Sequence, residues 1–579
     1  MKQKPLILQK KFSGFFWTQF LGAFNDNAFK QSVIFMITFK LASQLPEGTA
    51  DQLVPLGAGI FILPFVLFSP WAATWSDRAG KTKVIVATKI LEIGIMICGL
   101  LGFYLLNPQN PSTGIYFLMV VIFLMGTQST LFSPAKYGIM PEILKDEELT
   151  EGNGFLEMGT FVSILLGQFA GGWLVELFGH SPYFMSFFFI AISICGWLTS
   201  LRVPRTKPVE PHQKYALFFP RKIKQDFFKL RKNRLVFIVV MGISFFWFLG
   251  AALLTIVPGY GVFLGASLTQ TNFLMIAFSL GIGLGSLLCA ILSDGKIEMG
   301  LVPLGAFGMI GFSFAFGFLY PESVNSWSDM LWSYFQLFGL GMFGGFFIVP
   351  LNSLLQQRTS DQERASMIAL NNIINALFMV ISSGFIMGCM SAGLSQPQVI
   401  QLLGGTIIFG MIYLCLQQPE FFIRFILWGF TRLFYRVTIT NRQHIPLHHS
   451  ILFVTGHLDF IHACLIQMTT HRHIRFVVNF ENCQNSVTKW TLQQMGAIFV
   501  AESENTNNAE LLSVQIIDAL KQGDVVCIAQ AHQNILKNIS YPTIPVHLHG
   551  MPHDSHPVSL FQPLTISFGE LLPSPHRFL

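Results

Sequence analysis

Long apolar runs alternate with short polar breaks over most of the chain. Each run is roughly 20 residues or longer, the length that a helix needs to cross a bilayer. The pattern predicts six spanning helices near residues 13–39, 52–76, 84–106, 114–135, 154–178 and 181–201. It predicts six more near residues 235–260, 270–293, 299–320, 330–352, 366–390 and 397–417. The expected fold class is an all-α polytopic membrane bundle of 12 helices in two halves of six.

The texture of the sequence changes after residue 417. Residues 418–436 mix aromatic side chains with arginines, which is typical of an amphipathic helix lying at the membrane surface. Hydrophobic runs of strand length then alternate with helical stretches, which predicts a small cytoplasmic α/β domain. The expected organisation is a first half, a basic loop, a second half, an interfacial linker helix and an α/β domain, at residues 1–201, 202–234, 235–417, 418–436 and 437–579.

Composition indicates a membrane protein and excludes an ordinary soluble one. The 579 residues are 52% hydrophobic and 11% charged, whereas soluble proteins carry about 25% charged residues. The 8 cysteines have no paired spacing, which argues against a disulfide framework. Lysines between Lys2 and Lys11 lead straight into the first apolar run, so no cleaved signal sequence is expected.

The charges in the polar breaks predict the orientation of the bundle. The basic residues gather in the breaks of one side, at Arg78, Lys81, Lys83, Lys136, Lys145, Lys296, Arg358 and Arg364. The breaks of the other side hold no Lys or Arg, and Lys40 at the end of the first run is the one exception. Because positive charge favours the cytoplasmic side, both termini and the central loop are expected in the cytoplasm.

The central loop carries the excess positive charge of the protein. Residues 202–234 hold eleven Lys and Arg against Glu210 and Asp226, a local charge of +9. The whole chain is +6, so the remainder sums to −3, and a nucleic-acid partner is disfavoured. Two interpretations stay open. The loop binds anionic lipid, at about 1 kcal/mol per charge, or it is a topology signal without a binding role.

Polar residues interrupt the first apolar run at its centre. Asn25, Asp26 and Asn27 stand together, and Lys30 follows Asp26 by four positions, on the same helix face. Charged groups at membrane depth cost roughly 2.5–3.5 kcal/mol each, so they usually face a polar cavity and neutralise one another. A helix cap is the alternative interpretation of this cluster.

The break after the second run reads SDRAGKTK, from Ser76 to Lys83. It resembles the loop motif of the major facilitator superfamily, Gly-x-x-x-Asp-Arg-x-Gly followed by two basic positions. The resemblance implies a conformational latch between helix ends that breaks and re-forms as the halves rock. The residues of this charge latch are Asp77, Arg78, Gly80 and Lys81, with Asp294 in the corresponding break of the second half.

Longer stretches, such as Phe16–Lys30, Phe132–Leu144 and Ala369–Ser383, resemble the bacterial lysophospholipid transporter family. The resemblance implies a flippase of the bacterial inner membrane that carries lysophosphatidylethanolamine or lysophosphatidylglycerol to the cytoplasmic leaflet by alternating access. It implies no cofactor. Relatives are often fused to an acyltransferase, so a separate acyltransferase or acyl-carrier-protein synthetase is an expected partner. A major-facilitator exporter of amphipathic compounds is the alternative.

Such a carrier needs polar groups for the head group and an apolar wall for one acyl tail. The candidate substrate-binding residues are Asn25, Asp26, Asn27, Lys30, Lys89, Glu92, Glu157, Gln168, Asn371, Asn372 and Asn375. Lys89 and Glu92 are three apart and predict a second intramembrane pair. For each Asn or Gln, a hydrogen bond between helices is the alternative role. Lys136, Tyr137 and Asn153 are expected at the ends of spans, where gating and binding both stay open.

Residues 435–572 resemble the 1-acylglycerol-3-phosphate acyltransferases. That family's first motif is Asn-His-x-x-x-x-Asp, in which the Asp orients the His base. Gly456, His457 and His462 occupy the Asn, His and Asp positions here. The phosphate-binding Arg of the second motif is replaced by Glu502. The third motif, Phe-Pro-Glu-Gly, is replaced by Ala529, Gln530, Ala531 and His532.

These losses predict an acyltransferase-like domain that folds without catalysing, because acid–base chemistry needs both members of the pair. The alternative is a bifunctional transporter with an active acyltransferase that uses His457 with Asp459. The histidine-rich run His547–His556 matches no known metal-ligand spacing, so no metal site is predicted there.

Overall fold

A computed structural model describes most of the chain. The described residues are 5–41, 44, 49–106, 111–212, 219–266, 268–293, 297–319, 327–417, 423, 426, 436–441, 444–446, 450–469, 474–479, 486–494, 496–500, 506–521, 524–532, 535, 539, 541–549 and 563–572. The chain forms two compact units, one made of Met1–Ile297 with Leu304–Ile412, and the other of Glu298–Pro303 with Tyr413–Leu579. The predicted interfacial linker at 418–436 lies almost entirely outside the described residues.

The first unit is helical, and its long helices follow the predicted runs. The first half contains α1 Lys10–Phe35, α2 Thr49–Ala79, α3 Lys81–Tyr104, α4 Ser112–Gly138, α6 Leu149–Phe178 and α7 Tyr183–Ser200. The second half contains α9 Arg234–Phe263, α10 Leu268–Ser293, α11 Leu301–Gly317, α12 Trp327–Arg358, α13 Asp361–Ser391 and α14 Gln396–Gln417. Between α4 and α6 lie α5 Met140–Ile143 and the short helix η4 Asp146–Glu148.

Ten of the described helices are long and apolar enough to cross a membrane. Two of the 12 predicted spans fall short of that standard. Helix α11 has 17 residues, and α1 is made less apolar by Asn25, Asp26 and Asn27. The structure also adds a helix that the sequence did not predict. The second part of the basic loop forms α8, Phe219–Lys232, because its apolar and basic residues alternate at helical spacing.

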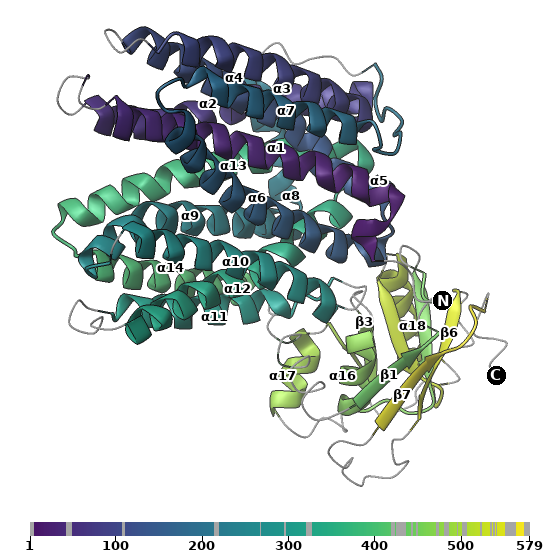
Figure 1. Ribbon diagram of the computed structural model, residues 1–579. Helices are drawn as coiled ribbons and strands as arrows, with labels where there is room; N and C mark the ends of the chain where they lie inside the picture. The colour runs from purple at the N-terminus through teal and green to yellow at the C-terminus, as the bar shows by residue number, and fades with distance from the viewer. Residues whose placement is uncertain are drawn as a thin grey trace. The chain divides into compact units, whose positions relative to one another are not determined.

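Consecutive long helices run antiparallel, so alternate connections meet at the same end of the bundle. The end where α2, α7 and α12 finish and where α3 and α13 begin is called the basic end below. Figure 1 shows the helices of the first half, in purple to blue, beside those of the second half, in teal to green. Helix α6 packs on α10 and α12, and α13 packs on α2 and α4, and these contacts join the halves.

Glycines allow the helices to approach one another closely. A Cβ atom at Gly281 of α10 would lie 2.1 Å from the carbonyl oxygen of Phe338, and one at Gly341 of α12 would lie 2.0 Å from that of Phe278. Helices in membranes associate by such close packing, since lipid offers no hydrophobic drive between them. Substituted side chains would therefore push α10 and α12 apart.

The second unit contains a seven-stranded sheet in the order β1-β7-β6-β2-β5-β3-β4. The strands are β1 Arg436–Thr440, β2 Ile451–Thr455, β3 Ile474–Asn479, β4 Ile498–Val500, β5 Val525–Ala529, β6 Thr543–His549 and β7 Pro563–Phe568. All described strand pairs are parallel except β6 with β7. The helices are α16 Phe460–Thr469, α17 Ser486–Gln494 and α18 Thr506–Lys521. The sequence pattern of strand-length apolar runs alternating with helical stretches predicted this α/β arrangement. Helices lie between the strands along the chain because parallel strands need long crossover connections.

Candidate functional site

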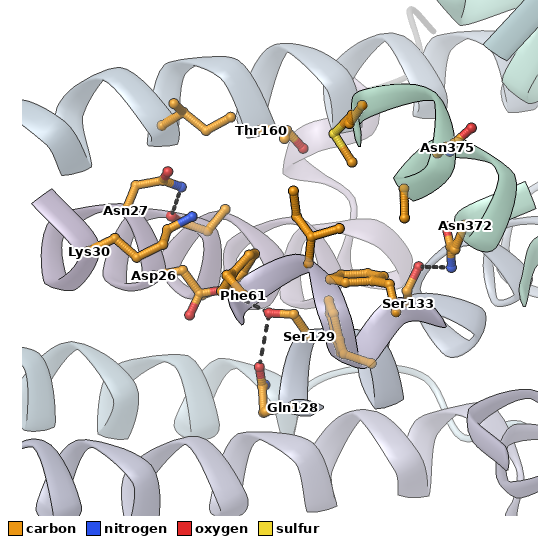
Figure 2. A pocket seen from close by; sticks show the side chains of 18 of the residues that line it. Asp26, Asn27, Lys30, Phe61, Gln128, Ser129, Ser133, Thr160, Asn372 and Asn375 are labelled. Carbon is orange, nitrogen blue, oxygen red and sulfur yellow. Dashed lines mark hydrogen bonds between the residues drawn. The ribbon is translucent and has the colours of Figure 1, made fainter. Parts of the chain in front are cut away.

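A cavity of about 520 Å³ lies between the two halves of the helical unit. Its lining comes from α1, α2, α3, α4 and α6 of the first half, and from α9, α12 and α13 of the second. Figure 2 shows part of this lining, with Asp26, Asn27 and Lys30 facing it from α1 and Asn372 and Asn375 from α13. The cavity is the candidate functional site, because ligand sites of transporters lie between the two repeats.

One face of α1 lines the cavity from Gln19 to near its end. The lining positions Gly22, Asp26, Lys30 and Ile34 recur at the four-residue spacing of a helix face. Asn27 also lines the cavity, and its amide donates a 2.7 Å hydrogen bond to the carbonyl of Ala23 in the preceding turn. The central polar cluster is therefore part of a continuous helix and is not a helix cap.

Asp26 and Lys30 do not neutralise each other by direct contact. The Asp26 carboxylate accepts a 2.9 Å hydrogen bond from the Ser129 hydroxyl of α4 (Figure 2). The Lys30 ammonium lies 4.0 Å from the ring centre of Phe61 on α2. Among the described residues, Asp26 and Lys30 form no ion pair with each other. Both charged groups therefore remain available to a ligand in the cavity.

The predicted pair of Lys89 and Glu92 is formed behind this face. Their charged atoms are 2.6 Å apart, and both side chains are buried. The Glu92 carboxylate also accepts hydrogen bonds from the amides of Asn25 and Gln128, both at 3.3 Å. Lys89 and Gln128 reach the cavity, whereas Asn25 and Glu92 do not line it. The network joins α1, α3 and α4 and so fixes the shape of the first half.

The asparagines of α13 line the cavity from the second half. Asn371, Asn372 and Asn375 are all lining residues. The Asn372 amide donates a 2.8 Å hydrogen bond to the Ser133 hydroxyl of α4, and the Asn375 carbonyl oxygen accepts one of 2.7 Å from Ser244. Hence one of these amides joins the two halves, and another is held within the second half.

Two further polar contacts join the halves towards the basic end. Asn153 of α6 and Gln356 of α12 exchange two hydrogen bonds of 3.0 and 2.9 Å. The amide of Asn352 donates a 3.0 Å hydrogen bond to the Glu157 carboxylate. Gln168 lines the cavity as predicted, but the described cavity does not reach Glu157. We call these two contacts the cavity floor, because Asn352 and Gln356 line the cavity at its basic end.

The cavity extends from this floor towards the opposite end of the bundle. Near that end it is lined by Leu53 of α2, Met119 of α4 and Ile37, which follows α1, all from the first half. The lining residues of α12 lie at its basic end, from Asn352 to Gln356. Because the contacts between halves gather at the basic end, the structure corresponds to a state closed at that end.

Some lining residues were not assigned to binding from the sequence. Lys136 and Tyr137, whose role was left open, both line the cavity, and the Lys136 ammonium lies 5.1 Å from the Tyr137 ring centre. Ser129, Ser133 and Thr160 were missed altogether. A lysine within an apolar run is a usable signal for a cavity position, whereas single hydroxyls are common in membrane helices and carry none.

The residues of the charge latch contact the segment that follows α7, at residues 206–210. Gly80 has a positive φ of 83°, and a Cβ atom there would lie 3.0 Å from the Thr206 carbonyl oxygen. The backbone carbonyl of Asp77 accepts hydrogen bonds from the amides of Val209 and Glu210, at 3.0 and 3.1 Å. The Asp77 carboxylate is buried and has no hydrogen-bond partner among the described residues.

One basic residue of the charge latch pairs with an acidic residue of another helix. Lys81 forms an ion pair with Glu142 of α5, and its side chain is buried. Asp294, the counterpart of Asp77 in the second half, lies outside the described residues. A latch role for these residues remains a prediction.

In the second unit, two of the degenerate motifs meet at one edge of the sheet. Gly456 and His457 follow β2, and Ala529–His532 follow β5, its parallel neighbour. A 2.8 Å hydrogen bond from the Gln530 amide to the Thr455 carbonyl oxygen joins the two strand ends. Glu502 lies outside the described residues.

The alternative base pair, His457 with Asp459, is not supported by this geometry. The Asp459 carboxylate bonds to His462, whose Nδ1 atom lies 2.7 Å away. The His457 ring stands edge-on to that of His462, with ring centres 5.2 Å apart. The carboxylate therefore orients the imidazole that replaces the motif Asp, and not the imidazole at the catalytic His position.

Comparison with known proteins identifies the class. Residues 16–383 match the model of the Major Facilitator Superfamily, and the chain belongs to this superfamily of membrane transporters. It is similar to the lysophospholipid transporter LplT of Klebsiella pneumoniae, with 28% identity over 419 residues, 70% of this chain and 95% of that protein. The LplT of Serratia proteamaculans is 27% identical over 387 residues, 65% of this chain and 88% of that protein.

Solved structures support the same fold. The human organic anion transporter MFSD10 is 13% identical, with a TM-score of 0.55 over 71% of this chain and 99% of that one. The proton:xylose symporter XylE is 16% identical, with a TM-score of 0.53 over 70% of this chain and 96% of that one. At these identities the likeness concerns the fold alone.

Proposed function

We propose that the protein carries lysophospholipids, chiefly lysophosphatidylethanolamine and lysophosphatidylglycerol, across a bacterial inner membrane by alternating access. The observation that carries this proposal is one cavity with lysines and amides at its centre and an apolar wall beyond them. A lysophospholipid has the same two parts, a charged head group and one acyl tail. The similarity to the LplT transporters supports the same substrate class.

Lys30 and Lys136 are the proposed partners of the lipid phosphate. Each ammonium lies over an aromatic ring, at 4.0 Å from Phe61 and 5.1 Å from Tyr137. Neither lysine forms an ion pair with a carboxylate among the described residues, whereas Lys89 is neutralised by Glu92. An anionic phosphate would regain charge pairing that the empty cavity lacks.

The remaining polar groups suit the rest of the head group. The Asp26 carboxylate accepts one hydrogen bond, from Ser129, and its other lone pairs can accept from an ethanolamine ammonium. Gln168 and Asn371 line the same cavity and can bond glycerol hydroxyls. The acyl tail would lie against Ile34, Ile37, Leu53 and the other apolar lining residues of the first half.

We further propose that α1 and α11 also cross the membrane, which gives twelve spans. Helix α1 packs along α6 and α7, and its polar cluster faces the cavity, so its low hydropathy does not expose charge to lipid. With the basic end in the cytoplasm, both termini are cytoplasmic and the described state is closed to the cytoplasm. The latch of Asp77 to Lys81 would then act at the closed end.

For the second unit, we propose a domain without acyltransferase activity. Support comes from Asp459, which bonds to His462, so that no carboxylate among the described residues orients His457. Reacylation of the delivered lipid would then fall to a separate acyltransferase or acyl-carrier-protein synthetase. The apportioning into residues 1–201, 202–234, 235–417, 418–436 and 437–579 is kept as a proposal.

The test uses purified protein in liposomes with labelled lysophosphatidylethanolamine and with acyl donors. Flipping is expected without acylation, and Lys30→Gln should reduce flipping by at least tenfold. Lys10→Gln is the matched control, since Lys10 lies on the same helix but is exposed and outside the cavity. Equal loss in both variants, or no flipping by the native protein, would refute the proposal. Efficient transport of amphipathic drugs without lysolipid would favour an exporter instead.

A further inference from the structure

The first degenerate motif places three metal-ligating side chains together. His457 follows β2, Asp459 precedes α16, and His462 lies in the first turn of that helix. One ligand atom from each of the three lies within 4.8 Å of the others. In the catalytic family motif, an Asp would occupy position 462, so the replacement by His adds a second imidazole to the same place.

Two hydrogen bonds hold this cluster in position. The Asp459 carboxylate accepts from the backbone amide of His462 at 2.8 Å, which caps the N-terminus of α16. The same oxygen lies 2.7 Å from Nδ1 of His462. Nδ1 of His462 and this oxygen face one another, so a metal ion that takes the place of the proton between them would be bound by both atoms.

The three side chains differ in their exposure to solvent. His462 is 8% exposed, Asp459 is partly exposed, and His457 is exposed. Tetrahedral zinc sites have bonds of about 2.0–2.2 Å, which places ligand atoms about 3.4 Å apart. The exposed His457 can rotate to bring a ring nitrogen to that spacing, and the Asp459 oxygen and Nδ1 of His462 need to separate only slightly from 2.7 Å when a metal ion replaces the proton between them.

We propose that His457, Asp459 and His462 form a binding site for a divalent transition-metal ion, for which Zn²⁺ is the fitting probe. Two imidazole nitrogens and one carboxylate oxygen are a donor set that binds zinc and similar ions. Three protein ligands leave a coordination position open on the exposed side of His457. The site is independent of the transport cavity, since all its residues lie in the second unit.

The test measures metal content directly. Full-length protein without a histidine tag is stripped with chelator, loaded with Zn²⁺, separated by gel filtration and analysed by elemental mass spectrometry. Co²⁺ loading provides an absorption spectrum that reports imidazole and carboxylate ligation. The expected result is about one ion per chain, with binding weakened at least tenfold in His457→Ala.

Two variants separate metal binding from folding. His462→Gln keeps an amide that can bond to Asp459 but lacks the imidazole ligand, and Asp459→Asn keeps the helix cap but removes the charge. Both should remain folded in chelator, as judged by a cooperative thermal transition, and bind Zn²⁺ at least tenfold more weakly. His549→Ala is the matched control, since His549 is an exposed imidazole on β6. Unchanged binding in His457→Ala, or binding lost only in His549→Ala, would overturn the proposal.

Discussion

The amide pair of Asn153 and Gln356 offers a direct test of how the cavity floor is closed. Each side chain donates one hydrogen bond to the other across the two halves, at 3.0 and 2.9 Å, and both are buried. We predict that replacing either residue by Leu shifts the protein towards a state open at the basic end. The closed state should lose stability because a buried amide atom is left without a partner.

The structure also predicts which substitution has the larger effect. In Gln356→Leu, Asn153 keeps its 2.9 Å hydrogen bond to the Leu149 carbonyl, so only its carbonyl oxygen is orphaned. In Asn153→Leu, both polar atoms of the Gln356 amide lose their described partner. An orphaned buried group costs about 1–3 kcal/mol, which corresponds to a shift in the equilibrium of about 5- to 150-fold.

The double variant should be milder than the sum of the single variants. Two hydrogen bonds between membrane helices are worth about 1.2 kcal/mol together, at about 0.6 kcal/mol each, and the double replacement leaves neither amide unpaired. A double-mutant cycle should therefore give a coupling free energy of about 1 kcal/mol or more. The control is Gln357→Leu, one position along α12, where no hydrogen bond of the side chain is described.

The assay measures distances between two spin labels by pulsed electron paramagnetic resonance. Glu147 and Gln362 are exposed at the basic end of the first and second half, and serve as label sites in a background without native cysteines. Longer distances should gain population in both single variants and less in the double variant. Strictly additive effects, or distance distributions like that of Gln357→Leu, would refute a closing role for the amide pair.

Three further predictions follow from other contacts. Lys89→Met should lower thermal stability in detergent, because removing one partner of a buried pair costs about 3–5 kcal/mol. Adding Glu92→Gln should restore part of it, because the neutral amide still accepts from Asn25 and Gln128; equal melting points of the single and double variants would contradict this. Gly126→Ala should cost about 1–3 kcal/mol, since its Cβ would lie 2.2 Å from the Phe61 carbonyl oxygen, whereas Gly94→Ala has no atom within 4 Å and should be neutral in the same melting assay. In the second unit, burial raises the pKa of Asp459 but the hydrogen bonds from His462 outweigh it, so the pKa lies below its usual value. The ionised Asp459 therefore stabilises the fold at pH above the usual pKa, and this contribution is lost as pH falls through the lowered pKa. Acid unfolding followed by limited proteolysis should show the loss, and the Asp459→Asn variant should lack this part of the pH dependence.

Local pattern was enough to predict most of the long helices and the strands of this protein. Apolar runs of bilayer length became long helices, because a helix satisfies every backbone group without water. Apolar runs of strand length after residue 436 form the strands of a mainly parallel sheet, because short apolar runs bounded by turn residues favour buried strands. Gly80 was recognised in the latch motif, and its positive φ of 83° explains why glycine is needed there.

The sequence also placed several polar residues on the cavity side, since charged groups inside a membrane need a polar neighbour. Asp26, Asn27, Lys30 and Gln168 were predicted for the site and line the cavity. The pair of Lys89 and Glu92 was predicted because its members are three apart on one helix, and its ion pair is present. Spacing within one helix therefore predicted the contact of Lys89 with Glu92, whereas the same argument failed for Asp26 and Lys30, which form no ion pair.

Contacts between distant segments were decided only by the tertiary structure. Asp26 bonds to Ser129, 103 positions away, in place of Lys30. Asn153 exchanges two hydrogen bonds with Gln356, 203 positions away, and nothing local to either residue indicated that pair. Sequence spacing determines which residues share a face, but the partner that each finds depends on how the packed helices bring other faces within 3 Å.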